Sequence, residues 1–115
     1  QMAPTTMPNQ RTTTSPFGRK VEDVGMPLRV AELLATLQTP GYVARQTVIK
    51  PKFITRAKKS IKKAFEYQMA DTCFSFVEIV STCPTNWGMT PVEAVEWAES
   101  NMLPYYPLGD LKQPE

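Results

Sequence analysis

The alternation of apolar and polar residues predicts a strand, a helix and a second strand in the middle of the chain. Residues 42–49 are rich in β-branched and aromatic side chains and are bounded by Gly41 and Pro51, which is typical of a strand. Pro51 opens a helix expected to reach about residue 70. Residues 73–81 form an almost continuous apolar run, typical of a strand buried on both faces of a parallel sheet. Together they predict a βαβ unit with a right-handed crossover. The apolar stripe expected on its helix is Ile54, Ala57, Ile61, Ala64 and Phe65.

Two further helices are expected on either side of this unit. Residues 27–38 have leucines at helical spacing after a proline in the first turn. A Thr-Pro-Val-Glu capping box at residues 90–93 predicts a helix to about residue 102 that buries Val92 and Val95, with Ala98 or Met102. The polar residues 1–25 and the Pro-rich residues 103–115 are expected to be irregular. Because two strands make an unstable parallel sheet, we expect more sheet upstream or on a partner chain.

A length of 115 residues suits one domain of modest core, the composition predicts that most of it is globular, and the net charge of +2 neither favours nor excludes nucleic acid. No apolar run approaches the roughly 20 residues that a bilayer span needs, and no signal peptide is visible. Two cysteines are too few for a disulfide framework, which favours a cytoplasmic protein with free thiols. The long polar start is either a disordered tail or a loop belonging to a larger protein.

The turn after the apolar strand holds the first candidate for chemistry, Cys83. In open α/β sheets, ligands bind beyond the carboxyl ends of strands, and thiolate is a soft ligand suited to iron–sulfur clusters. From spacing alone, simple packing of a small apolar side chain is the favoured alternative. Cys73 begins the same strand, roughly 30 Å away if the strand is extended, so the two thiols are not expected to share a site. We interpret Cys73 as a packing residue.

The predicted crossover helix holds the second candidate. Seven of the 13 lysines and arginines lie between Lys50 and Lys63, and no acidic residue interrupts them. This is either a solvated outer face or an electrostatic footprint for nucleic acid or an acidic protein. The absence of interleaved aromatic residues favours the solvated face. With no histidine, no Gly-rich phosphate loop and no paired carboxylates, the sequence assigns no catalytic residue.

Several segments taken together resemble one protein family. They are a Gln-x-x-Pro-Thr-Thr loop at residues 1–6, a Gly-Tyr-Val-Ala-Arg strand at 41–45, the basic crossover helix, a Val-Glu-Ile-Val-Ser-Thr-Cys-Pro-Thr-Asn-Trp segment at 77–87, and a Met-Leu-Pro-Tyr-Tyr-Pro-Leu-Gly-Asp tail at 102–110. The combination resembles the thiamine-diphosphate-binding beta subunit of 2-oxoacid:ferredoxin oxidoreductases, of the 2-oxoglutarate or 2-oxoisovalerate type. It covers essentially the whole chain, which is then expected to be a C-terminal fragment of that subunit.

The resemblance implies a fold and an organisation. The fold is the C-terminal part of a thiamine-diphosphate-binding domain, a parallel βαβ unit with flanking helices. Residues 1–26 are expected to form an irregular loop beside the cofactor, residues 27–103 the βαβ-containing part, and residues 104–115 a Pro-rich tail.

The resemblance also implies site residues. Gln1, Pro4 and Thr5 match the loop beside the diphosphate and thiazolium, and Cys83 matches one ligand of a 4Fe–4S cluster. The family's Mg²⁺-binding Gly-Asp-Gly motif and its other cluster cysteines are not in this sequence. The fragment alone is therefore expected to bind neither cofactor nor cluster and to be inactive.

The implied activity is oxidative decarboxylation of a 2-oxoacid to acyl-coenzyme A with reduction of ferredoxin. The implied partners are an alpha subunit and other subunits, ferredoxin, a 2-oxoacid and coenzyme A, with no nucleic acid and no membrane. A small module that binds nucleic acid or an acidic protein through the Lys-rich helix is the alternative.

Overall fold

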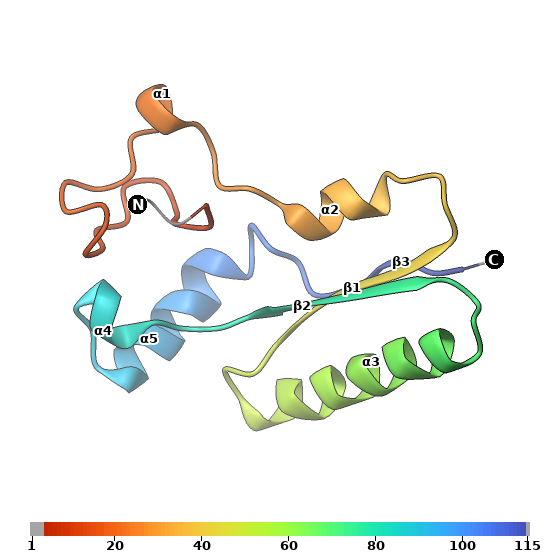
Figure 1. Ribbon diagram of the computed structural model, residues 1–115. Helices are drawn as coiled ribbons and strands as arrows, with labels where there is room; N and C mark the ends of the chain where they lie inside the picture. Colours follow the sequence, from red (N-terminus) through yellow and green to blue (C-terminus); the bar gives the residue numbers. More distant parts are fainter. Residues whose placement is uncertain (1–3, 115) are drawn as a thin grey trace. The chain divides into compact units, whose positions relative to one another are not determined.

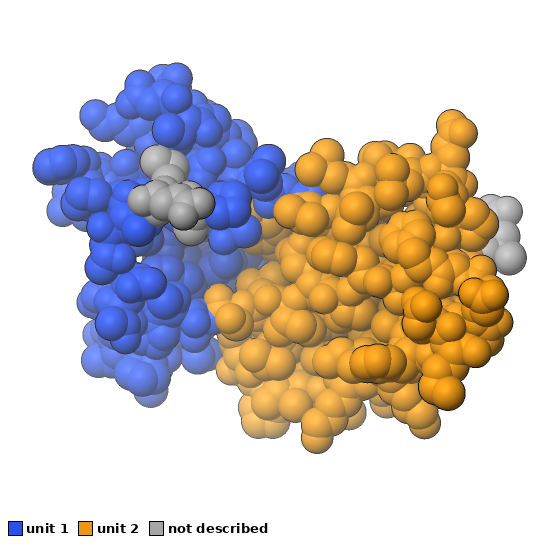
Figure 2. Space-filling model, viewed as in Figure 1, with its two compact units in different colours: residues 1–29, 82–105 blue, residues 30–81, 106–115 orange. Residues whose placement is uncertain are grey.

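The computed structural model of the protein describes residues 4–114, and residues 1–3 and Glu115 lie outside the described part. The chain divides into two compact units, each made of segments that are far apart in the sequence. The loop unit comprises Gln1–Arg29 and Thr82–Tyr105, and the sheet unit comprises Val30–Ser81 and Tyr106–Glu115. Figure 2 colours the loop unit blue and the sheet unit orange.

The sheet unit contains the predicted βαβ arrangement. Strands β1 (Gly41–Thr47) and β2 (Phe74–Val80) pair in parallel, and helix α3 (Pro51–Met69) connects them (Figure 1). The register runs without a break from Gly41 opposite Phe74 to Thr47 opposite Val80. The three predicted elements are thus confirmed to within about two residues at each end.

A third strand, β3 (Gly109–Lys112), lies antiparallel to β1, so the strand order is β2-β1-β3. The prediction that residues 103–115 are irregular was therefore wrong for residues 109–112. Four residues between prolines are too short for a periodic signal, and it is the free edge of β1 that gives them hydrogen-bonding partners. In the described part of the chain, the outer edge of β2 has no strand partner.

Helices cover both faces of the central strand. Helix α3 lies on one face and helix α2 (Val30–Ala35) on the other (Figure 1). Every residue of β1 is buried, whereas β2 is mostly half-buried. The prediction that the apolar strand at residues 73–81 is buried on both faces was wrong, because that strand lies at the edge of the sheet and its neighbour lies at the centre. Helix α2 is also shorter than the predicted residues 27–38.

Helix α3 presents a different face to the sheet from the one its apolar stripe predicts. Phe53, Ala57 and Ser60 are its buried residues. Ile54 and Ile61 are exposed by about 40%, and Phe65 by 65%. The small side chains of Ala57 and Ser60 allow the helix to approach the strands closely, and the Ser60 hydroxyl accepts a hydrogen bond of 2.9 Å from Gln46 on β1. The helix is thus rotated about its axis relative to the prediction, and it makes a polar contact with β1 that hydrophobic periodicity does not detect.

The second part of the loop unit is helical. It contains α4 (Pro84–Trp87), α5 (Pro91–Trp97) and a π-helical turn, η1 (Ala98–Met102). The predicted capping box is confirmed: the Glu93 N–H donates to Thr90 Oγ1 at 3.2 Å, and the Thr90 N–H donates to the Glu93 carboxylate at 2.9 Å. The predicted burial was partly wrong, because Val92 is 69% exposed. The buried residues of these helices are Ala94, Ala98 and Met102.

The N-terminal segment of the loop unit is held in place by polar contacts. The Arg19 side chain is 4% exposed and donates hydrogen bonds to the carbonyls of Val24, Gly25 and Met26 at 2.9–3.3 Å. The first of these carbonyls belongs to the last residue of the short helix α1 (Val21–Val24) and the other two come directly after it, so the guanidinium donates to acceptors at the C-terminal end of α1. The Asn9 N–H also donates to the Arg19 carbonyl at 2.9 Å. Between residues 4 and 25 the expectation of an irregular tail was therefore only partly right.

Among the helices described, none combines the length and the hydrophobicity that crossing a membrane requires.

Candidate functional site

Cys83 occupies the N-cap position of helix α4, three residues after β2 ends. Pro84 fixes the first helical position, and the Trp87 N–H donates to the Cys83 carbonyl at 3.0 Å. The Cys83 side chain makes no capping hydrogen bond, and the residue is half-buried. The backbone of Cys83 is thus fixed by the turn while its thiol takes no part in holding that turn together.

An iron–sulfur cluster does not fit on this chain alone. A 4Fe–4S cluster takes four thiolate ligands, and the sequence contains two cysteines. Both are free thiols, and Cys73 belongs to the sheet unit whereas Cys83 belongs to the loop unit. Residues 4–114 contain no group of three or more cysteine, aspartate and glutamate side chains arranged to hold a metal ion. The chain contributes Cys83, at most, as one ligand of a set.

Of the three N-terminal residues that the resemblance singles out, the structure describes Pro4 and Thr5. Gln1 lies outside the described residues. Pro4 and Thr5 form an exposed turn, and the Pro4 carbonyl accepts a hydrogen bond of 2.9 Å from the Leu28 N–H. The turn is therefore anchored by its backbone, and the Thr5 side chain is left open to solvent.

The structure brings the N-terminal segment and the Cys83 turn into the same compact unit. The Thr13 N–H donates to the carbonyl of Asn86, on helix α4, at 3.0 Å. Sequence patterns place these segments at opposite ends of the chain and give no reason to join them.

Two residues of this segment, Gln10 and Ser15, were not singled out from the sequence. They are only 7% and 5% exposed. Gln10 Oε1 accepts from the Met7 N–H at 2.8 Å, but Gln10 Nε2 and Ser15 Oγ have no hydrogen-bond partner in the described part of the chain. An unsatisfied buried polar atom costs about 1–3 kcal/mol, so these two atoms stand out among the buried polar groups of the described chain. The sequence offers no signal for them beyond a polar loop composition.

A cluster of charges in the sheet unit is, by contrast, saturated. Arg45 on β1 is fully buried, and its Nε donates to Glu78 on β2 at 2.9 Å. Its Nη1 donates to Glu32 on α2 at 2.7 Å and to the Pro107 carbonyl at 3.3 Å. Burial alone lowers the pKa of Arg45, but the two carboxylates outweigh burial and raise it. This cluster has a structural role, joining α2 to both parallel strands.

The basic residues of helix α3 divide into two groups. Arg56, Lys59 and Lys63 line a groove of about 300 Å³ in the sheet unit, together with polar residues of β1 and β3. Lys58 and Lys62 are exposed and do not line this groove. Arg56 and Lys59 are exposed like Lys58 and Lys62, in agreement with the interpretation of a solvated basic face, whereas Lys63 is half-buried.

The fold and the site define an α/β protein with a mixed sheet and an available thiol after a parallel edge strand. Sequence comparison is more specific. The chain is 38% identical over 112 residues to the ketoisovalerate oxidoreductase subunit VorA of Methanothermobacter thermautotrophicus. The aligned residues make up 97% of this chain and 24% of the relative. The chain is also 35% identical over 101 residues to the 2-oxoglutarate synthase subunit KorB of Archaeoglobus fulgidus, covering 88% of this chain and 33% of the relative. The chain is thus related, over most of its length, to subunits of 2-oxoacid oxidoreductases.

The chain spans about a quarter to a third of the length of these curated relatives. No family model matches it, and no solved structure matches it significantly. The resemblance inferred from the sequence is confirmed at the level of a 2-oxoacid oxidoreductase subunit.

Proposed function

We propose that the chain forms part of the thiamine-diphosphate-binding subunit of a 2-oxoacid:ferredoxin oxidoreductase. The proposed reaction is oxidative decarboxylation of a 2-oxoacid to acyl-coenzyme A with reduction of ferredoxin. The observation that carries the proposal is the similarity, over 88–97% of the chain, to subunits of two enzymes whose names specify 2-oxoacids, ketoisovalerate and 2-oxoglutarate. The alpha subunit and other subunits, coenzyme A and ferredoxin are its proposed partners.

The N-terminal segment supports a role next to the cofactor. Bound thiamine diphosphate, with Mg²⁺, supplies the nucleophile and the electron sink of such a reaction. The orphaned polar atoms of Gln10 and Ser15 fit a polar ligand, and the exposed Thr5 hydroxyl is available as a donor. We propose that Gln1, Pro4 and Thr5 border the cofactor and that Gln10 and Ser15 hydrogen-bond to it or to ordered water at its edge.

Cys83 is proposed as one ligand of a 4Fe–4S cluster whose other ligands lie outside this chain. Its thiol is not engaged in capping α4, and its backbone is held by Pro84 and by the Trp87 N–H. A ligand fixed in this way loses little conformational freedom on metal binding. Once formed, the cluster serves as a one-electron carrier.

The activity is tested with the subunit that contains this chain, assembled with its partner subunits. We expect reduction of a viologen dye that depends on a 2-oxoacid, on coenzyme A and on thiamine diphosphate. An assembled complex that has full cofactor content but reduces no dye with ketoisovalerate, 2-oxoglutarate or pyruvate would overturn the proposal.

The cluster ligand is tested with a matched pair of variants in the same complex, Cys83→Ser and Cys73→Ser. Cys83→Ser is expected to lower the iron and acid-labile sulfide content and to weaken the visible absorption of the cluster. Cys73→Ser is expected to leave both unchanged. Iron content that is unaltered in Cys83→Ser, or equally lowered in both variants, contradicts the assignment.

The loop that contains Gln10 and Ser15 is tested on the assembled complex by measuring thiamine diphosphate binding, independently of turnover. Gln10→Glu keeps the Oε1 that accepts from the Met7 N–H and removes the orphaned Nε2 donor, and it is expected to weaken thiamine diphosphate binding about tenfold. Thr14→Ala, at an exposed position of the same loop, serves as control. Equal affinities measured by calorimetry for the two variants would remove Gln10 from the site.

A further inference from the structure

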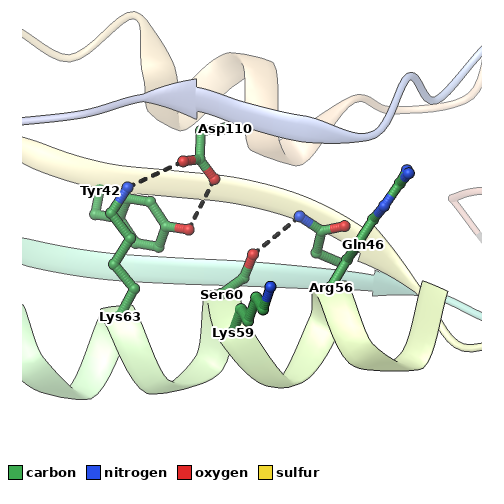
Figure 3. Close-up of a pocket in the computed structure, with 7 residues that line it drawn as sticks. All are labelled: Tyr42, Gln46, Arg56, Lys59, Ser60, Lys63 and Asp110. Atoms are coloured by element: carbon green, nitrogen blue, oxygen red, sulfur yellow. Dashed lines mark hydrogen bonds and ion pairs between the residues drawn. The ribbon is translucent and has the colours of Figure 1, made fainter. Parts of the chain in front are cut away.

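The groove in the sheet unit is a second place where ligand chemistry is available. It lies between helix α3 and the edge of the sheet formed by β1 and β3 (Figure 3). Three of its seven residues are the cations Arg56, Lys59 and Lys63, which lie on one stripe of α3. The others are Tyr42, Gln46, Ser60 and Asp110. The groove belongs to a different compact unit from Thr5, Gln10 and Cys83.

The cations of the groove differ in their partners. Lys63 Nζ lies 3.2 Å from Asp110 Oδ2, so these two charges compensate each other. Arg56 packs its guanidinium 5.8 Å from the centre of the Phe53 ring. In the described part of the chain, no carboxylate lies within ion-pair distance of Arg56 or Lys59. Three cations and one carboxylate leave a formal excess of two positive charges in the groove.

The floor of the groove is polar, buried and already ordered. Tyr42, Gln46 and Ser60 are each 7% exposed or less. The Gln46 amide donates to Ser60 Oγ at 2.9 Å, and the Tyr42 hydroxyl donates to Asp110 Oδ1 at 2.8 Å. Gln46 Nε2 carries two protons, and its bond to Ser60 uses one of them. These hydrogen bonds order the floor, and the Gln46 amide keeps one proton beyond its bond to Ser60.

We propose that this groove binds a phosphate group carried by a small molecule. Arg56 offers a planar pair of N–H donors that matches phosphate oxygens, and Lys59 adds a point charge beside it. A phosphate monoester carries nearly two negative charges at neutral pH, which equals the excess positive charge of the groove. Asp110 does not oppose such a ligand with a full charge, because Lys63 and the Tyr42 hydroxyl already compensate it.

The size of the groove favours a small ligand over a nucleic-acid strand. A volume of about 300 Å³ lies at the lower end of the roughly 300–1,000 Å³ typical of small-molecule sites. Nucleic-acid surfaces instead spread cations along a strand and combine them with aromatic stacking platforms. Here the one aromatic ring lining the groove, Tyr42, is fully buried, and Lys58 and Lys62 lie outside the groove.

The test is a titration of the chain with inorganic phosphate and with diphosphate at constant ionic strength, followed by calorimetry and by amide chemical shifts. Phosphate is expected to shift the amides of residues lining the groove, whereas chloride at equal ionic strength is not. Arg56→Ala and Lys59→Ala are each expected to weaken phosphate binding about tenfold. Asp110→Asn, which releases Lys63 from its ion pair, is expected to tighten phosphate binding several-fold.

Lys58→Ala is the matched control, because it removes the same charge from the same helix outside the groove. Circular dichroism establishes that each variant is folded. The proposal is overturned if chloride reproduces the phosphate shifts, or if Lys58→Ala weakens binding as much as Lys59→Ala. The proposal is also overturned if a single-stranded oligonucleotide binds and if Arg56→Ala, Lys59→Ala and Lys58→Ala weaken that binding equally. Such a result would indicate a diffuse basic surface instead of a phosphate site. None of these readouts depends on thiamine diphosphate or the cluster, so the result is independent of the proposed oxidoreductase activity.

Discussion

Positive charge occurs in the sheet unit in two different settings. Arg45 is fully buried at the centre of the sheet and is bonded to two carboxylates and a carbonyl. Arg56 and Lys59 lie on the exposed rim of a groove, and among the described residues neither has an ion-pair partner. The same type of charge thus serves the fold in one place and is available to a ligand in the other.

The difference follows from the cost of removing a charge from water. A buried guanidinium is tolerated only when paired and hydrogen-bonded, so its partners must be part of the fold. An exposed cation is solvated and contributes little to stability, so its position is free to serve binding.

The largest effect on stability is expected for Arg45→Met, which leaves Glu32 and Glu78 facing each other without the guanidinium. The free energy of unfolding is expected to fall by about 3 kcal/mol, as for other broken buried pairs. Urea denaturation followed by circular dichroism measures it. Adding Glu32→Gln and Glu78→Gln to the variant is expected to recover part of the loss. A loss below about 1 kcal/mol would show that the ion pairs of Arg45 with Glu32 and Glu78 do not hold the fold together.

A smaller loss is expected when one carboxylate of the cluster is neutralised. Glu78→Gln removes the charged acceptor of Arg45 Nε and weakens the acceptor for the Ala31 N–H at the start of α2, at an expected cost of about 1–2 kcal/mol. Glu66→Gln is the control, since Glu66 forms an exposed pair with Lys62 at 3.8 Å and its loss should cost under about 0.5 kcal/mol. Equal losses in the two variants would contradict the distinction between buried and exposed charge.

The buried floor of the groove predicts a dependence of stability on alkaline pH. The pKa of Tyr42 is raised to about 12, chiefly by burial; Ser60 lowers it, and the nearby Asp110 and Tyr67 contribute smaller increases that are included in this value. Because this pKa exceeds its unfolded value of about 10, the folded chain binds the phenolic proton more tightly. The resulting stability is present below about pH 10 and is lost as pH rises towards 12.

This dependence is measured as the free energy of unfolding between about pH 9 and about pH 11 in the native chain and in Tyr42→Phe. The difference between the two curves isolates the contribution of Tyr42 from that of Lys63 and Tyr67, which lie near its ring. Native stability is expected to fall more steeply with pH than that of the variant. Parallel curves would mean that the folded state does not hold the phenolic proton.

The smallest effect on stability is expected at the rim of the groove. Lys59→Ala breaks no ion pair in the described structure, and alanine has the higher helix propensity, so the free energy of unfolding should change by less than about 0.5 kcal/mol. Thermal denaturation checks this, with Arg45→Met as the destabilised reference. If Lys59→Ala lost more than about 1 kcal/mol, the rim would belong to the fold rather than to a binding site.

The sequence by itself determined those parts of the protein whose signals are local. The strands β1 and β2, the long helix α3 and the capping box of α5 follow from periodicity and from side chains three or four residues apart. The relation to 2-oxoacid oxidoreductase subunits also came from sequence, through motifs spread over the whole chain. Cys83 was singled out because it directly follows the carboxyl end of a predicted strand, although its proposed role as a ligand rests on the resemblance.

Only the tertiary structure decided what depends on contacts between distant residues. The tail becomes β3 because β1 offers a free edge, and α3 turns Ser60 rather than Ile61 towards the sheet, where Ser60 meets Gln46. Burial of Gln10 and Ser15, and the joining of their loop to α4, have no sequence signal, since any polar loop contains such residues. The groove arises in the same way. Its cations were visible in the sequence, but only the packing of α3 against the sheet separates those that line the groove from those that lie outside it.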